Sequence, residues 1–139
     1  MFKYLKTLYS STHPTETMEF ISNYSEENYQ GIKRGAIISI EYEEVSPMLN
    51  TQLPLYLALN SKNSGEQKMI KCIRILPGMI FEADIDPNAE ANNFYIGVTC
   101  DVKLDETNQG AYLTRDGDPR FEVINNSGVT KGKVTVIAI

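Results

Sequence analysis

The sequence has no tryptophan, one histidine and two cysteines among its 139 residues. The histidine, His13, stands beside Pro14 in a polar segment, with no partner there for a nucleophile triad. The cysteines, Cys72 and Cys100, are not the closely spaced pair that zinc sites use. No glycine-rich phosphate loop is present. We therefore expect a protein without catalytic residues, without a cofactor and without a metal site.

Basic residues are also few: 13 Lys and Arg stand against 18 Asp and Glu, for a formal net charge of −5. Nucleic-acid binding needs clustered Lys and Arg to neutralise phosphates, and Lys33-Arg34 is the only adjacent basic pair. No apolar run approaches the ~20 residues of a membrane-spanning helix, and the N-terminus shows no apolar core of a secretory signal. We expect neither nucleic acid nor membrane as a partner.

Short alternating segments bounded by turn residues run through most of the chain. Residues 96–104 show the pattern best, since successive side chains of a strand point to opposite faces. This recurrence predicts an all-β fold, a small antiparallel β-barrel or sandwich of about eight or nine strands. Residues 15–29 are the only helix candidate, with poor apolar spacing, and no internal repeat is visible. In residues 96–104 we expect an apolar face of Ile96, Val98, Cys100, Val102 and Leu104, and a solvated face of Gly97, Thr99, Asp101 and Lys103.

The first thirty residues differ from residues 31–139, which we assign to the barrel or sandwich domain. In residues 1–30, tyrosines are scattered among Ser, Thr, Asn and Glu. Tyrosine supplies a large amphipathic contact area at low entropic cost, so one interpretation is an extended arm that binds a partner. The other is a first strand and a long loop of the same domain. The candidate partner-binding residues are Tyr4, Tyr9, Tyr24 and Tyr29.

The two cysteines lie in apolar, strand-like runs. Free cysteine is among the most buried residue types, so two buried thiols are the simpler interpretation. A disulfide between Cys72 and Cys100 would require their strands to be neighbours.

Two acidic motifs can be assigned from local chemistry. Residues 84–88 resemble the opening of a calcium loop, but Ala89 and Tyr95 stand where that loop needs Gly and a bidentate Glu. We interpret the segment as a solvated strand end. The run Asp116-Gly117-Asp118 is typical of a tight turn.

A family resemblance rests on four short segments. Residues 32–40 (IKRGAIISI) give an apolar residue, basic residues, Gly and then a strand. Ile96-Gly97-Val98, the Gly-led strand 110–113 and Val134-Thr135-Val136 follow in order. Together they resemble the small β-barrel decoration proteins of tailed-bacteriophage capsids, over residues 31–139. The resemblance implies a non-catalytic virion protein, made in the host cytoplasm, that binds the major capsid protein at the capsid surface and forms a homo-oligomer, commonly a trimer.

Two other functions are compatible with this composition. A glycan-binding or adhesion module would stack sugars on exposed aromatic side chains, for which Tyr56, Tyr95 and Tyr112 are candidates. A tail or baseplate component of the virion is the other. Sugar-dependent thermal stabilisation would favour the adhesion module, whereas strong, salt-insensitive binding to empty capsids would favour the decoration protein.

Overall fold

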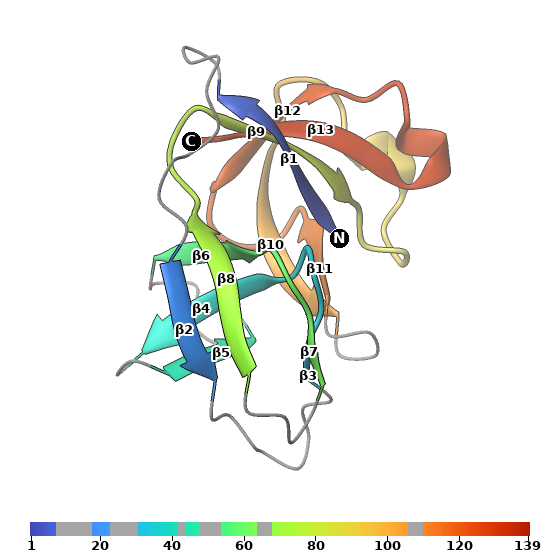
Figure 1. The fold of residues 1–139 in the computed structure, drawn as a ribbon. Helices are drawn as coiled ribbons and strands as arrows, with labels where there is room; N and C mark the ends of the chain where they lie inside the picture. Colours follow the sequence, from blue (N-terminus) through green and yellow to red (C-terminus); the bar gives the residue numbers. More distant parts are fainter. Residues whose placement is uncertain (8–17, 23–30, 42–43, 48–53, 64–67, 106–109) are drawn as a thin grey trace. The chain divides into compact units, whose positions relative to one another are not determined.

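The computed structural model describes residues 1–7, 18–22, 31–41, 44–47, 54–63, 68–105 and 110–139 (Figure 1). Within these ranges the chain forms strands and two short 3-10 helices but no α-helix, so the predicted all-β class is confirmed. The chain divides into two compact units. Unit 1 comprises Met1–His13, Leu76–Lys103 and Tyr112–Ile139; unit 2 comprises Pro14–Ile75 and Leu104–Ala111. This division differs from the boundary that we expected at residue 30.

Unit 1 contains most of a six-stranded sheet of order β1-β9-β13-β12-β10-β11. The sheet curls until the chain just after β9 reaches β11 (Figure 1). There Ile85 forms a parallel bridge with Leu113, and Asp86 N donates to Leu113 O at 3.0 Å. The result is barrel-like. Its strands are β1 (Phe2–Thr7), β9 (Met79–Asp84), β10 (Thr99–Asp105), β11 (Gly110–Thr114), β12 (Phe121–Asn125) and β13 (Lys133–Ala138), and its 3-10 helices are η1 (Ala91–Asn93) and η2 (Val129–Lys131).

Three phenylalanines form the centre of the unit 1 core. Phe2, Phe81 and Phe121 come from β1, β9 and β12, and their ring centroids lie 5.4–6.1 Å apart in tilted or edge-to-face geometry. Such pairs contribute roughly 0.5–1.5 kcal/mol beyond the area that they bury. Apolar residues at alternate positions of β12 and β13 complete the core: Val123, Val134, Val136 and Ala138.

β1 is an integral strand of this sheet. It pairs with β9 so that Phe2 lies opposite Ala83 and Tyr4 opposite Phe81. Tyr4 is half-buried, with its ring 5.9 Å from that of Phe81 and its hydroxyl 2.8 Å from Thr7 Oγ1. Residues 2–7 therefore form a first strand, and Tyr4 is not the free anchor of an arm. The other three tyrosines proposed as anchors, Tyr9, Tyr24 and Tyr29, lie outside the described residues.

Unit 2 contains a five-stranded sheet of order β2-β8-β6-β4-β5, and its two outermost strands also contact each other. Its strands are β2 (Met18–Ser22), β4 (Ile37–Glu41), β5 (Glu44–Pro47), β6 (Leu55–Ala58) and β8 (Lys68–Arg74), and a separate ribbon pairs β3 (Gly31–Ile32) with β7 (Lys62–Asn63). One core cluster comprises Ile32, Ala36, Ile38, Ala58, Ile70 and Cys72, with Tyr56 packed against it.

The two sheets repeat one strand order. In each unit the first strand pairs with the fifth, the fifth with the fourth, the fourth with the second and the second with the third. The five strands are β9, β10, β11, β12 and β13 in unit 1, and β2, β4, β5, β6 and β8 in unit 2. The registers agree as well, since Cys100 opposite Phe121 corresponds to Ile38 opposite Tyr56. No internal repeat is visible in the amino-acid sequence, yet the same five-stranded arrangement occurs twice in the structure.

β10 follows the predicted alternation with two exceptions. Asp101 is only 6% exposed, although we expected it in solvent. Ile96 is exposed because the chain turns before Val98, and β10 begins only at Thr99. The side chain of Leu104 lies outside the described set. As predicted, Val98, Cys100 and Val102 are buried, and Thr99 and Lys103 are exposed.

Neither cysteine forms a disulfide, and both side chains are buried, as predicted. Cys72 lies on β8 and Cys100 on β10, which belong to different sheets, so these two strands do not pair with each other.

Candidate functional site

The turn before β10 exposes two large side chains. Tyr95 and Ile96 are 56% and 62% exposed, whereas Phe94 and Val98 on either side are buried. Burying an aliphatic or aromatic side chain of this size is worth roughly 1.5–3 kcal/mol. Folding of the isolated chain gains only part of that energy at these two positions, and a partner that covers them would gain the rest. We therefore take the Tyr95-Ile96 turn as the candidate contact site.

Backbone hydrogen bonds fix the shape of this turn. Val98 N donates to Tyr95 O at 3.1 Å, which closes the turn, and Gly97 N donates to Val123 O at 2.8 Å, which fastens it to β12. Gly97 has a φ of 92°, a left-handed conformation that other residues adopt only with strain. Glycine is thus the residue that lets the chain turn outward here.

Side chains from two later segments hold the same turn. Arg115, just after β11, donates from Nη1 to Asn93 O at 2.8 Å, and its guanidinium lies 5.7 Å from the centroid of the Tyr95 ring. Asn126 Nδ2 donates to Phe94 O at 3.5 Å. The Tyr95 side chain, which lies against Arg115, loses little conformational freedom when a partner binds, and this favours affinity. Tyrosine and arginine are also among the residues most enriched at binding hot spots.

Asp101 has a structural role that the sequence pattern did not reveal. Its Oδ1 accepts from Val102 N at 2.8 Å, and its Oδ2 accepts from Asp118 N at 2.9 Å. Arg120 Nε lies 3.3 Å from Oδ1, an ion pair without hydrogen-bond alignment. A Cβ on Gly117 would collide with the carboxylate, so the loop packs tightly over it. These contacts hold the loop between β11 and β12. The only signal in the sequence was the turn-forming run 116–118.

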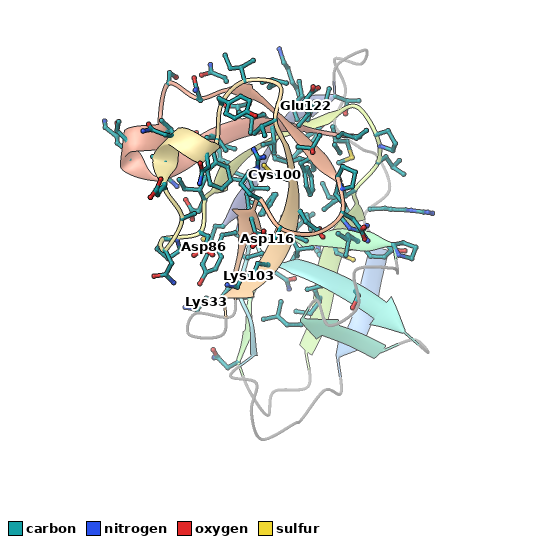
Figure 2. All side chains as sticks on the ribbon, turned by 180° about the vertical axis from the view of Figure 1, so that it is seen from behind. Lys33, Asp86, Cys100, Lys103, Asp116 and Glu122 are labelled. Carbon is teal, nitrogen blue, oxygen red and sulfur yellow. The ribbon has the colours of Figure 1, made fainter. Side chains whose placement is uncertain are left out.

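The suspected calcium segment uses its acids in a turn and in ion pairs. Asp86 Oδ1 accepts from Asn88 N at 2.9 Å, and Oδ2 lies 3.5 Å from Lys103 Nζ (Figure 2). Asp84 pairs with Lys133 Nζ at 2.7 Å and with the N-terminal ammonium. In the described ranges no three His, Cys, Asp or Glu side chains are grouped so that they could hold a metal ion.

The surroundings of Cys72, Cys100 and Asp84 shift the pKa values of these side chains. Burial raises the pKa of both Cys72 and Cys100 to about 11, so neither thiol is a thiolate nucleophile near neutral pH. Burial alone would raise the pKa of Asp84. Hydrogen bonds from Lys133 and the N-terminal ammonium outweigh this effect and lower that pKa below its usual value.

Of the three tyrosines considered for sugar stacking, only Tyr95 is well exposed, because Tyr56 and Tyr112 are half-buried. No helix in the described part of the chain is both long enough and apolar enough to cross a membrane. Comparison with known proteins found no matching family model, no significantly similar curated protein and no significantly similar solved structure.

Proposed function

We propose that this chain is a structural virion protein that binds and stabilises the capsid shell of a tailed bacteriophage. The observation that carries the proposal is the pinned Tyr95-Ile96 turn, which presents an aromatic and an aliphatic side chain on a rigid β scaffold. The segment resemblance over residues 31–139 supplies the class of partner, which is the major capsid protein.

The physical requirements of shell binding suit this turn. A protein that stabilises a shell binds its partner without a chemical reaction, so it needs contact area on a rigid support rather than a reactive group. Tyr95 is held by Arg115, and Gly97 fastens the turn to β12. Binding would bury Tyr95 and Ile96 with little loss of conformational entropy. We expect an apolar pocket on the capsid protein to receive them.

The test is sedimentation of the purified full chain with empty shells. Truncating a hot-spot residue costs at least about 2 kcal/mol, so Tyr95→Ala should weaken binding about thirtyfold. Leu76→Ala is a matched control, because Leu76 is also an exposed apolar residue of unit 1, at 48%. It should bind like the parent. No binding of the parent chain to shells would reject the function, and equal losses in both variants would reject the site.

A glycan-binding module is the second candidate, and the exposure of Tyr95 favours it too. Sugars would stack on the face of the ring that Arg115 does not cover. A thermal shift in the presence of sugars, removed by Tyr95→Ala, would support this function over shell binding.

The assembly state is part of the proposal. Apolar side chains such as Leu5, Leu76 and Ile124 are exposed and available to pair, and we propose a homo-oligomer, with a trimer favoured by the resemblance. Light scattering on the free protein, and its copy number per capsid subunit in purified particles, test this point. A monomer in both would contradict it.

A further inference from the structure

Unit 2 contains the counterpart of the Tyr95-Ile96 turn. Gly35, before β4, has a φ of 86° and donates from N to Ala58 O at 2.9 Å, which fastens the turn to β6. Ala36 N donates to Lys33 O at 3.0 Å and closes it. Each of these bonds has its equivalent at Gly97 and Val98, on the equivalent strands. The two units thus present the same turn at the same point of the repeated fold.

The exposed pair in unit 2 is cationic rather than apolar. Lys33 and Arg34 are both exposed, and they occupy the positions that correspond to Tyr95 and Ile96 (Figure 2 labels Lys33). The turn is held on both sides, because Ile32 before it is buried and Arg34 N donates to Ser61 Oγ at 2.9 Å. Two positive charges are therefore displayed on a fixed support.

These charges are not neutralised in the described part of the structure. Although the chain has an excess of acids, no ion pair among the described residues involves Lys33 or Arg34. Three basic side chains of unit 1 do have acidic partners: Lys103 pairs with Asp86, Lys133 with Asp84 and Arg120 with Asp101. A single exposed base is ordinary on a solvated surface. Lys33 and Arg34 are the only adjacent basic pair of the sequence and lie on a turn that backbone hydrogen bonds fix, so a solvated surface accounts for them less readily.

We propose that the Lys33-Arg34 turn is a second contact site, which binds a carboxylate-rich protein surface. The inference rests on the proposed function, since it assigns the acidic surface to the shell. Arginine can bind a carboxylate through two parallel hydrogen bonds, and lysine adds a point charge. Nucleic acid suits the site less well, because affinity for phosphates grows with the number neutralised and the chain is acidic overall.

The two turns should respond differently to salt. Attraction between surface charges is screened within ~10 Å at 0.1 M salt and within ~3 Å at 1 M. Apolar burial does not weaken in this way. Binding lost through the Lys33-Arg34 turn should therefore be largest at low salt, and binding lost through the Tyr95-Ile96 turn should be nearly independent of salt.

The experiment compares the full chain with the double variant Lys33→Gln/Arg34→Gln in shell binding at low and high salt. The control, Lys3→Gln/Lys131→Gln, removes the same charge from two other exposed positions. We expect about a tenfold loss for the first variant at low salt, less than threefold at ~1 M salt, and less than twofold for the control throughout. Equal losses in the two variants would overturn the inference.

A second measurement separates this inference from the proposed function. Poly-L-glutamate and a DNA duplex are titrated into the free, isotope-labelled protein, and backbone amide shifts are followed by NMR. Shifts at Lys33, Arg34 and Gly35 with poly-L-glutamate, absent in the double variant, support the inference even if shells do not bind. No shift at these amides with poly-L-glutamate, or a stronger response to DNA, overturns it.

Discussion

Unit 1 and unit 2 use one strand order and one turn, yet they present different chemistry at that turn. Gly35 and Gly97 share the left-handed conformation, and the residues after them, Ala36 and Val98, are both buried. The exposed positions just before each glycine are unconstrained by the fold, and there the units differ completely. The comparison separates what the backbone requires from what a surface is free to become. It also places two candidate contacts at equivalent points of the repeat.

The largest expected effect is the difference in stability between truncating a buried aromatic residue of unit 1 and truncating an exposed one. Phe81→Ala removes the ring that packs against Phe2 and Phe121, and it should lower the free energy of unfolding by about 3–5 kcal/mol. Tyr95→Ala should change it by less than about 0.5 kcal/mol. Urea denaturation of both variants measures the contrast. Similar losses in the two would mean that Tyr95 belongs to the core rather than to a contact surface.

The next largest effect on stability should come from Asp101, the buried carboxylate of β10 in unit 1. The equivalent position in unit 2 is Ser39, which is also buried but uncharged. Asp101→Ser copies unit 2 into unit 1; it leaves Asp118 N without its acceptor and the Arg120 guanidinium without its carboxylate partner. We expect a loss of about 2–4 kcal/mol, measured by denaturation. If the loss were below about 0.5 kcal/mol, the range of ordinary surface substitutions, the carboxylate would not be what holds the loop.

Both glycines of the repeated turn, Gly35 and Gly97, should be sensitive to substitution by alanine. Alanine in a left-handed conformation costs roughly 1–2 kcal/mol, and a Cβ at Gly97 meets no atom within 4 Å, so strain alone should set the cost there. We expect Gly97→Ala to lower stability by about this amount, and Gly35→Ala by at least as much, because Gly35 is buried. A neutral effect at one position only would show that the two turns are not equivalent.

The sequence predicted the strands well and the repeat not at all. Alternation along residues 96–104 was enough to place Val98, Cys100 and Val102 in the core. It failed at Asp101, because the burial of this carboxylate depends on the backbone amide of Asp118 and the positive charge of Arg120, both distant in the sequence. It failed at Ile96 because the strand pattern was continued across a turn.

The repeat and the candidate site were missed for related reasons. Equivalent positions of the two units share backbone geometry rather than residue identity: Lys33 and Arg34 correspond to Tyr95 and Ile96, and Ser39 corresponds to Asp101. The signal that remains is a glycine followed by a buried apolar residue and a strand, which many β proteins contain. Only the strand order and the shared hydrogen bonds reveal the duplication.

The smallest expected effect is a pH dependence confined to unit 1. Asp84 lies opposite Lys133 in the ladder between β9 and β13, whereas Ile21 lies opposite Met69 at the equivalent point of unit 2. Because folding lowers the pKa of Asp84, its ion pairs stabilise the protein at pH values above 3.8, the usual pKa of this carboxyl group. That stability is lost as the pH falls through the folded value. The pKa of Lys133 is raised, chiefly by its hydrogen bond to Asp84, so its contribution is lost only as the pH rises through its own folded value.

Both side chains are partly exposed, so we expect no more than about 1 kcal/mol from the pair. Asp84→Asn should lower stability slightly at pH 7 and have almost no effect at pH 2, where the parent carboxyl is protonated as well. Urea denaturation of the parent and the variant from pH 7 to pH 2 gives this difference directly. Glu90→Gln is the control, because Glu90 is exposed and lies in no ion pair among the described residues. If the Asp84→Asn difference stayed constant across that range, the carboxylate charge would not be the source of the stability, and this electrostatic distinction between the units would be lost.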